Sequence, residues 1–158
     1  MIAFVLVQGA YVQDLVKEKA GLSGEIIITG RERVVDVSQG AAAKGVMPGM
    51  SLAHARRICP GAFVFQLEGC QSVALQGRLQ EFYSHFTPFL EPYSSREFFL
   101  DLGGGSGTMD VAARILKKLV PFFGYRAVLG LASSKLLARA IVLAAGDPRV
   151  IKCLKTIS

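Results

Sequence analysis

The chain has 158 residues, of which 51% are hydrophobic and 19% are charged. This composition excludes a disordered segment and suits one globular body with a buried core. Eighteen lysines and arginines against twelve aspartates and glutamates give a net charge of +6. The excess favours a polyanionic partner such as nucleic acid, although an ordinary basic protein would carry the same charge.

Neither a membrane span nor a zinc site is expected. No apolar run approaches the ~20 residues that cross a bilayer, and Met1–Val7 is interpreted as a first strand rather than a signal peptide. The three cysteines form no Cys-x-x-Cys pair and are accompanied by two histidines, whereas structural zinc needs four clustered nitrogen or sulfur ligands. A cytoplasmic location without membrane contact is the resulting expectation.

The first part of the chain predicts a strand, a short helix and a strand-rich segment. Ile2–Val7 is a continuous apolar run, typical of a strand that is buried on both faces. Gly21 ends the helix after it, and Ser51 caps a later helix. In chain order, the elements after the first strand are a helix over 11–20, strands over 25–29 and 33–37, a helical turn over 39–44, a helix over 51–59 and a strand over 63–67.

The second part predicts a long helix, a hairpin and a further helix–strand–helix run. The long helix covers 71–86, because apolar residues recur there at helical spacing. Its apolar stripe consists of Leu75, Leu79, Phe82 and Phe86. A second amphipathic helix covers 110–123, and its stripe runs to Phe122 and Phe123. The other elements are strands over 89–93 and 97–102, a glycine-rich loop over 103–107, a strand over 125–131, a helix over 133–145 and a weak strand over 150–154.

These elements predict an α+β fold with two domains. With residues 21–67 set aside, the order is β-α-β-β-α-β, which is the ferredoxin-like order. The first and third strands of this order lie side by side at the centre of the sheet. Residues 1–20 and 68–158 are expected to form a discontinuous ferredoxin-like domain, and residues 21–67 a small inserted subdomain.

Acidic residues are scarce where a two-metal site would need them. A nucleic-acid polymerase holds two divalent metals with carboxylates, which on this layout would lie at the end of the first strand and around the hairpin turn. Residues 1–10 contain no acid, and the hairpin offers Glu91, Glu97 and Asp101. A metal site built from these three residues remains an alternative. Asp101 is better explained as a turn residue before the glycine-rich loop.

Two segments between a strand and a helix are candidates for phosphate contacts. Gly103–Gly107 matches neither G-x-G-x-x-G nor G-x-x-x-x-G-K-[ST], and it predicts a flexible turn. Ser133, Ser134 and Lys135 lie where backbone N–H groups and a lysine could hold a phosphate. A serine N-cap followed by a surface lysine explains the same residues equally well.

Three segments are similar to motifs of the Y-family (DinB/UmuC) DNA polymerases. Residues 45–60 follow the pattern G-V-x-x-G-M-x-L-x-x-A-x-x-x-C-P. Residues 90–102 resemble V-E-P-x-S-x-D-E-x-x-L-D-V, and residues 129–139 resemble G-I-x-x-N-K-x-L-A-K. Their order and spacing also agree. The resemblance implies the N-terminal part of such a polymerase, with the ferredoxin-like domain as the palm and the insertion as the fingers.

The departures from the family pattern fall on its metal-binding positions. Where the family carries D-x-D at the first strand, this sequence has Leu6, Val7 and Gln8. Where the family carries a paired Asp-Glu at the hairpin turn, this sequence has Arg96 and Glu97. An arginine there would repel a metal ion and could pair with Glu97 instead. The resemblance therefore implies that no catalytic residue is intact and that Glu97 is vestigial.

Some nucleotide and DNA contacts are retained under the same resemblance. Lys135 corresponds to a phosphate-binding lysine of the family, with Ser134 beside it, and Tyr11 falls near its ribose-checking aromatic residue. The triphosphate-binding Tyr and Arg of the fingers are Gln39 and Ala42 here. The expected DNA-binding residues are Arg56, Arg57 and Arg139.

Within this family, the missing metal ligands indicate a resemblance to the catalytically inactive branch typified by ImuB. It implies a role in DNA repair and in damage-induced (SOS) mutagenesis, in which this part of the protein binds DNA weakly. The full-length protein is implied to bind a sliding clamp, an ImuA-type protein and an active replicative-type polymerase. No cofactor is expected. The alternatives are an active Mg²⁺-dependent DNA nucleotidyltransferase with a degenerate site, and a ferredoxin-like interaction module without a link to DNA.

Overall fold

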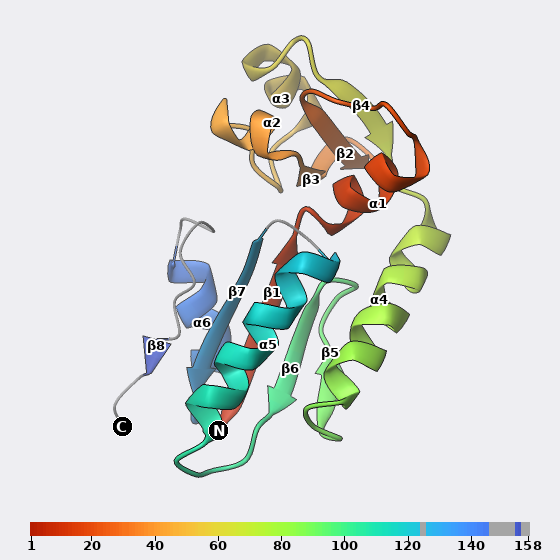
Figure 1. Ribbon diagram of the computed structural model, residues 1–158. Coiled ribbons are helices and arrows are strands. Elements are labelled where there is room, and N and C mark those ends of the chain that lie inside the picture. Colours follow the sequence, from red (N-terminus) through yellow and green to blue (C-terminus); the bar gives the residue numbers. More distant parts are fainter. Residues whose placement is uncertain (124–125, 146–153, 156–158) are drawn as a thin grey trace. The chain divides into compact units, whose positions relative to one another are not determined.

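The computed structural model divides the chain into two compact units (Figure 1). The first unit comprises Met1–Val7 and Ala74–Ser158, and the second comprises Gln8–Val73. Within the described part of the chain, no helix is long and apolar enough to span a membrane. The residues that the structure describes are 1–123, 126–145 and 154–155.

The first unit is built on a five-stranded sheet. Its strands are β1 (Ile2–Gln8), β5 (Leu90–Pro92), β6 (Glu97–Asp101), β7 (Arg126–Ala132) and β8 (Leu154–Lys155). In space their order is β5-β6-β1-β7-β8, and β1 pairs antiparallel with β6. This pairing confirms the predicted central position of the first and third strands. Most of the strand predicted over 150–154 lies outside the described residues.

Helices cover both faces of this sheet. They are α4 (Gly69–Ser84), α5 (Thr108–Phe123) and α6 (Lys135–Ala144). Phe98 contacts Tyr83 of α4, with 5.1 Å between the ring centroids. Its neighbour Phe99 belongs instead to a buried cluster with Ala138 and Val142 of α6. Because successive strand residues point to opposite faces, α4 and α6 cover opposite faces, and Figure 1 shows α5 in front of the sheet with α6 behind it.

The predicted apolar stripes of α4 and α5 are buried except near their C-terminal ends. The α4 stripe continues from Leu79 to Tyr83, which is fully buried, whereas Phe82 is partly buried. Phe123 of α5 packs against Phe82, with 5.4 Å between the ring centroids. Phe122 is 63% exposed, so its predicted place in the stripe is wrong. The last turn of α5 directs Phe123, rather than Phe122, toward α4.

The hydroxyl group of Tyr83 is buried and has no hydrogen-bond partner among the described residues. Burial raises the pKa of this phenol, so the group stays a neutral donor. We expect Tyr83→Phe to raise the free energy of unfolding by about 1 kcal/mol, because an unsatisfied buried hydroxyl is costly. Tyr11→Phe is the control, since it removes a hydroxyl that donates to Ser72 Oγ at 3.2 Å, and it should lower that free energy. Urea unfolding measures both, and a destabilised Tyr83→Phe variant would contradict the prediction.

The second unit combines a small sheet with three short helices. Its strands are β2 (Ile26–Gly30), β3 (Arg33–Val37) and β4 (Phe63–Gln66), and its helices are α1 (Ala10–Glu18), α2 (Gln39–Ala43) and α3 (Leu52–Ile58). β2 is central, antiparallel to β3 and parallel to β4. Ser51 caps α3 as predicted, because its Oγ accepts a hydrogen bond from His54 N at 3.2 Å. The core of the unit contains Ile27, Val34, Val37, Ala41, Val46, Ala55 and Cys59.

Helix α1 belongs to the second unit, although the sequence predicted it with the ferredoxin-like domain. The buried carboxylate of Asp36, on β3, accepts hydrogen bonds from Gly9 N at 2.7 Å and Tyr11 N at 3.0 Å. These bonds satisfy donors at the N-terminus of α1 and tie the helix to β3. The predicted domains were residues 1–20 with 68–158, and residues 21–67. In the structure, residues 8–20 and 68–73 belong to the second unit and not to the first.

Candidate functional site

The predicted site positions Leu6, Arg96 and Glu97 meet near the end of β1. Leu6 lies opposite Glu97 in the β1–β6 register, and Val7 N donates to the carbonyl oxygen of Arg96 at 3.0 Å. Directly opposite residues of an antiparallel pair point to the same face. The side chain of Leu6 is therefore the neighbour of the Glu97 carboxylate. Gln8 is the last residue of β1.

The carboxylate of Glu97 is bonded within the hairpin turn. Its Oε2 accepts a hydrogen bond from Ser94 Oγ at 2.7 Å. The backbone carbonyl of Glu97 accepts a second bond from Tyr93 N at 2.8 Å. A pairing of the Arg96 guanidinium with this carboxylate stays a prediction.

The three hairpin acids do not converge on one point. Asp101 lies four residues along β6 from Glu97, a separation of roughly 13 Å at the rise of a strand. Its Oδ1 accepts a hydrogen bond from Gly103 N at 2.9 Å, which confirms the predicted turn role. Glu91 is paired with Lys135. In the described part of the chain, no three His, Cys, Asp or Glu side chains form a group that could hold a metal ion.

Lys135, at the start of α6, is neutralised by an acidic residue. Its Nζ lies 2.5 Å from Glu91 Oε2 and 5.6 Å from the centroid of the Phe99 ring. Ser134 is the N-cap of α6, with its Oγ accepting a hydrogen bond from Leu137 N at 3.3 Å. The N-cap interpretation of this serine is confirmed, and a phosphate contact stays a prediction. Sequence reasoning missed Glu91 as a partner, because 44 positions separate it from Lys135.

Arg139, one turn further along α6, stacks on Tyr93. Its guanidinium carbon is 4.6 Å from the centroid of the tyrosine ring. Tyr93 also meets the buried rings of Phe4 and Phe99 at interplanar angles of 78° and 86°. The motif pattern leaves the position of Tyr93 unspecified, so nothing in the sequence singled it out. Tertiary contacts alone make it part of this site.

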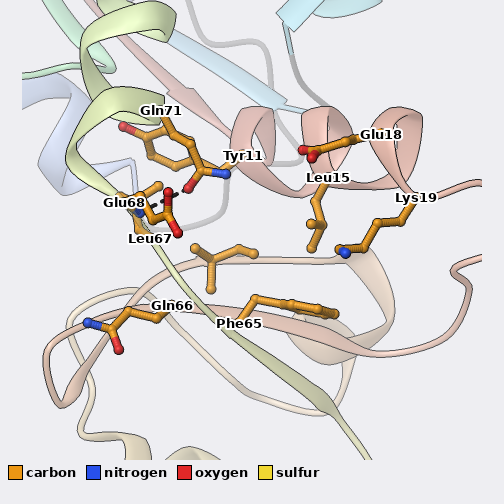
Figure 2. A pocket seen from close by; sticks show the side chains of 10 residues that line it. Tyr11, Leu15, Glu18, Lys19, Phe65, Gln66, Leu67, Glu68 and Gln71 are labelled. Atoms are coloured by element: carbon orange, nitrogen blue, oxygen red, sulfur yellow. Dashed lines mark hydrogen bonds between the residues drawn. The ribbon is translucent and has the colours of Figure 1, made fainter.

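In the second unit, Tyr11 lines a pocket of about 250 Å³ (Figure 2). Tyr11 is 5% exposed, and its hydroxyl donates to Ser72 Oγ. Glu68 and Gln71 contribute polar groups to the same pocket, and Gln71 Oε1 accepts a hydrogen bond from Glu68 N at 2.9 Å. The other predicted nucleotide contacts, at the start of α6, belong to the first unit, so the structure does not place them with Tyr11 in one unit.

The two remaining predicted DNA-binding residues, Arg56 and Arg57, lie in the last turn of α3. Both side chains are exposed. Their charge suits the C-terminal end of a helix, where cations interact favourably with the helix dipole. Exposed arginines can contact a phosphate backbone without reading sequence, and this role stays a prediction for both residues.

Comparison with known proteins shows that the chain is similar to part of DNA polymerases. A sequence profile of the impB/mucB/samB family matches residues 10–142. The chain is 30% identical over 127 residues to DNA polymerase IV of Desulfatibacillum aliphaticivorans, which covers 75% of this chain and 32% of that protein. It is 31% identical over 102 residues to DNA polymerase IV of Shewanella baltica, which covers 60% of this chain and 28% of that protein. The chain thus spans about a third of the length of these relatives.

Solved polymerase structures share the fold. The insertion ternary complex of Dbh DNA polymerase matches with a TM-score of 0.75 and 19% identity, over 98% of this chain and 48% of that one. DinB from Sulfolobus solfataricus matches with a TM-score of 0.69 and 20% identity, over 90% of this chain and 45% of that one. The likeness confirms the predicted α+β palm-and-fingers fold.

These relatives correct the expectation that no cofactor is needed. Polymerases work with two divalent metal ions, so Mg²⁺ is the cofactor that the relatives imply. The residues present here do not fit such a pair of ions. The end of β1 offers Leu6 and Gln8, the Glu97 carboxylate is bonded to Ser94, and Asp101 closes a distant turn. The disagreement lies in the side chains at the metal-binding positions and not in the fold.

The sequence comparisons show the family of this chain. The profile covers residues 10–142, and a relative at 30% identity covers 75% of the chain. The structural neighbours add the same fold over nearly the whole chain. The chain therefore belongs to the impB/mucB/samB family of Y-family DNA polymerases.

Proposed function

We propose that this chain is a non-catalytic Y-family polymerase-like protein, which binds DNA and recruits other replication proteins in DNA repair and damage-induced mutagenesis. The pairing of Leu6 with Glu97 carries the proposal. Phosphoryl transfer needs charge stabilisation of the attacking and leaving oxygens. An apolar side chain opposite Glu97 and an arginine before it, Arg96, do not supply the carboxylates that this chemistry uses.

Other observations support DNA and protein partners. The net charge of +6 favours a polyanion. The relatives are DNA polymerases, and one structural neighbour is a ternary complex. The sliding clamp, the ImuA-type protein and the active polymerase are further proposed partners. The proposed setting is the SOS response in the bacterial cytoplasm.

Family membership favours a second candidate, an active Mg²⁺-dependent DNA nucleotidyltransferase. The relatives carry this activity in their names. Against it stands the separation of the three hairpin acids, of which Glu91 is paired with Lys135 and Asp101 closes a turn. Such an enzyme would need Glu97 together with ligands that the motif pattern does not supply.

Primer extension separates the two candidates. We expect the purified chain to extend a primed DNA template no faster than the background without protein, in Mg²⁺ or in Mn²⁺, because the described residues offer no convergent carboxylates. DNA polymerase IV of Desulfatibacillum aliphaticivorans, at the same molar concentration, is the positive control. Extension by the parent chain that Glu97→Ala abolishes would overturn the proposal and establish the enzyme.

The same preparation reports DNA binding. Fluorescence anisotropy with labelled primed and single-stranded DNA, at increasing salt, should show a weak affinity that falls as salt rises, since phosphate contacts release counterions. Binding without extension is the expected combination. The absence of any salt-sensitive binding would instead identify a ferredoxin-like interaction module without a link to DNA.

A further inference from the structure

We propose that Tyr93 and Arg139 form a binding element for one nucleotide unit of an unpaired DNA strand, with the base stacked on Tyr93 and the phosphate paired with Arg139. The inference rests on the proposed function, because it takes DNA binding by this chain as given. It adds where the DNA binds and which form of DNA is bound. Both residues belong to the first unit, one in the β5–β6 turn and one on α6.

The charge of Arg139 calls for an anion. The side chain is partly buried, and its Nε is buried without a hydrogen-bond acceptor among the described residues. No carboxylate in the described part of the chain forms an ion pair with it. Its observed contact is the face of Tyr93, at 4.6 Å from the ring centroid. A cation without a counter-ion, partly removed from water, favours an external anion such as a phosphodiester.

The neighbouring cation does not share this need. Lys135 is paired with Glu91 Oε2 at 2.5 Å and lies over the Phe99 ring. A phosphate that approached Lys135 would meet the negative charge of Glu91, whereas a phosphate at Arg139 meets no described acidic group paired with that arginine. Lys135 and Arg139 lie one helical turn apart on α6, so their positions alone do not decide which residue binds the phosphate. Arg139 is favoured because, unlike Lys135, it is not paired with a described carboxylate.

Tyr93 provides a fixed and accessible aromatic surface. Its ring is held by edge-to-face contacts with the buried rings of Phe4 and Phe99, at 6.1 Å and 5.9 Å between centroids. Its backbone N–H donates to the carbonyl oxygen of Glu97 at 2.8 Å, which closes the turn. The residue nevertheless remains 52% exposed, although Arg139 lies over its ring. A rigid ring that is half open to solvent loses little entropy when a planar base stacks on it.

An exposed aromatic ring beside an arginine that pairs with no described carboxylate is a combination with which proteins hold unpaired nucleic acid strands. Bases of a duplex are stacked on each other and offer no free face, so an unpaired strand fits better than a duplex. Every base has a flat face, and binding should therefore depend little on sequence. A free nucleotide carries the same base and phosphate, and the test below separates it from a strand.

The test is a set of anisotropy titrations of the 158-residue chain with a labelled oligothymidylate. Tyr93→Ala should weaken binding about tenfold or more, and Tyr93→Phe should stay within about twofold of the parent, because the ring is what stacks. Arg139→Gln should weaken binding and lower the salt slope by about 0.7, the value for one phosphate of a single strand. On an oligomer with abasic sites, Tyr93→Ala should cost less affinity than on oligothymidylate.

Matched controls and outcomes make the test decisive. Phe89→Ala removes an exposed aromatic ring from the same unit, and Arg114→Gln removes an exposed charge. Both variants should still bind oligothymidylate through stacking on Tyr93. If the parent binds DNA and Tyr93→Ala binds equally well, this inference fails while the proposed function stands. If the parent binds no DNA, both fail. Displacement of the strand by thymidine monophosphate or triphosphate at strand-like concentrations would assign the site to a free nucleotide. Urea unfolding confirms that each variant is folded.

Discussion

Gly130→Ala is expected to lower the free energy of unfolding by about 3 kcal/mol, because it adds a methyl group where no space exists. A Cβ atom at this position on β7 would lie 2.4 Å from the backbone carbonyl oxygen of Ala138 and 3.0 Å from Cγ2 of Val142. Since the first contact is with the backbone of α6, the helix itself would have to move away from the sheet. Urea unfolding followed by circular dichroism measures the change.

Gly77→Ala is the matched control in the same unit. A Cβ atom there meets no other atom within 4 Å, and alanine is favoured over glycine inside a helix by roughly 0.5–1 kcal/mol. Chemically identical substitutions in β7 and α4 should thus change stability in opposite directions. A Gly130→Ala variant as stable as the parent would contradict the close packing of α6 on β7. Because α6 carries Arg139, the substitution should also weaken the stacking of Arg139 on Tyr93.

Asp36→Ala is expected to destabilise the second unit by about 3 kcal/mol, because it leaves backbone donors buried without an acceptor. The Asp36 carboxylate accepts hydrogen bonds from Gly9 N at 2.7 Å, Tyr11 N at 3.0 Å and Val12 N at 3.4 Å. It also places a negative charge at the positive end of the α1 dipole. Urea unfolding measures the global effect, and amide hydrogen exchange at Gly9 and Tyr11 reports the local one.

Glu32→Ala is the control for the loss of an acidic residue in the same unit. The Glu32 side chain is exposed, so its removal should change stability by less than about 0.5 kcal/mol. Asp36→Asn should be intermediate, because an amide keeps one acceptor oxygen and loses the charge. Unchanged exchange at Gly9 and Tyr11 in Asp36→Ala would contradict the attachment of α1 to β3.

Local sequence patterns predicted the elements better than the boundaries between units. The apolar run at Ile2–Val7 and the caps at Ser51 and Ser134 are all present. Helix α1 was misplaced because its attachment depends on Asp36, a residue 24 or more positions away from the donors that it caps. The pairing of Lys135 with Glu91 was missed for the same reason, because 44 positions separate the two residues.

The sequence by itself determined the order of the elements, the family and the loss of acidic residues at the end of β1, because periodicity, motifs and residue identity are local properties. Only the tertiary structure decided how the retained cations are used. The pairing of Lys135 with Glu91 and the stacking of Arg139 on Tyr93 join segments more than forty positions apart. Such contacts depend on strand register and helix packing, which bring distant side chains within reach of each other.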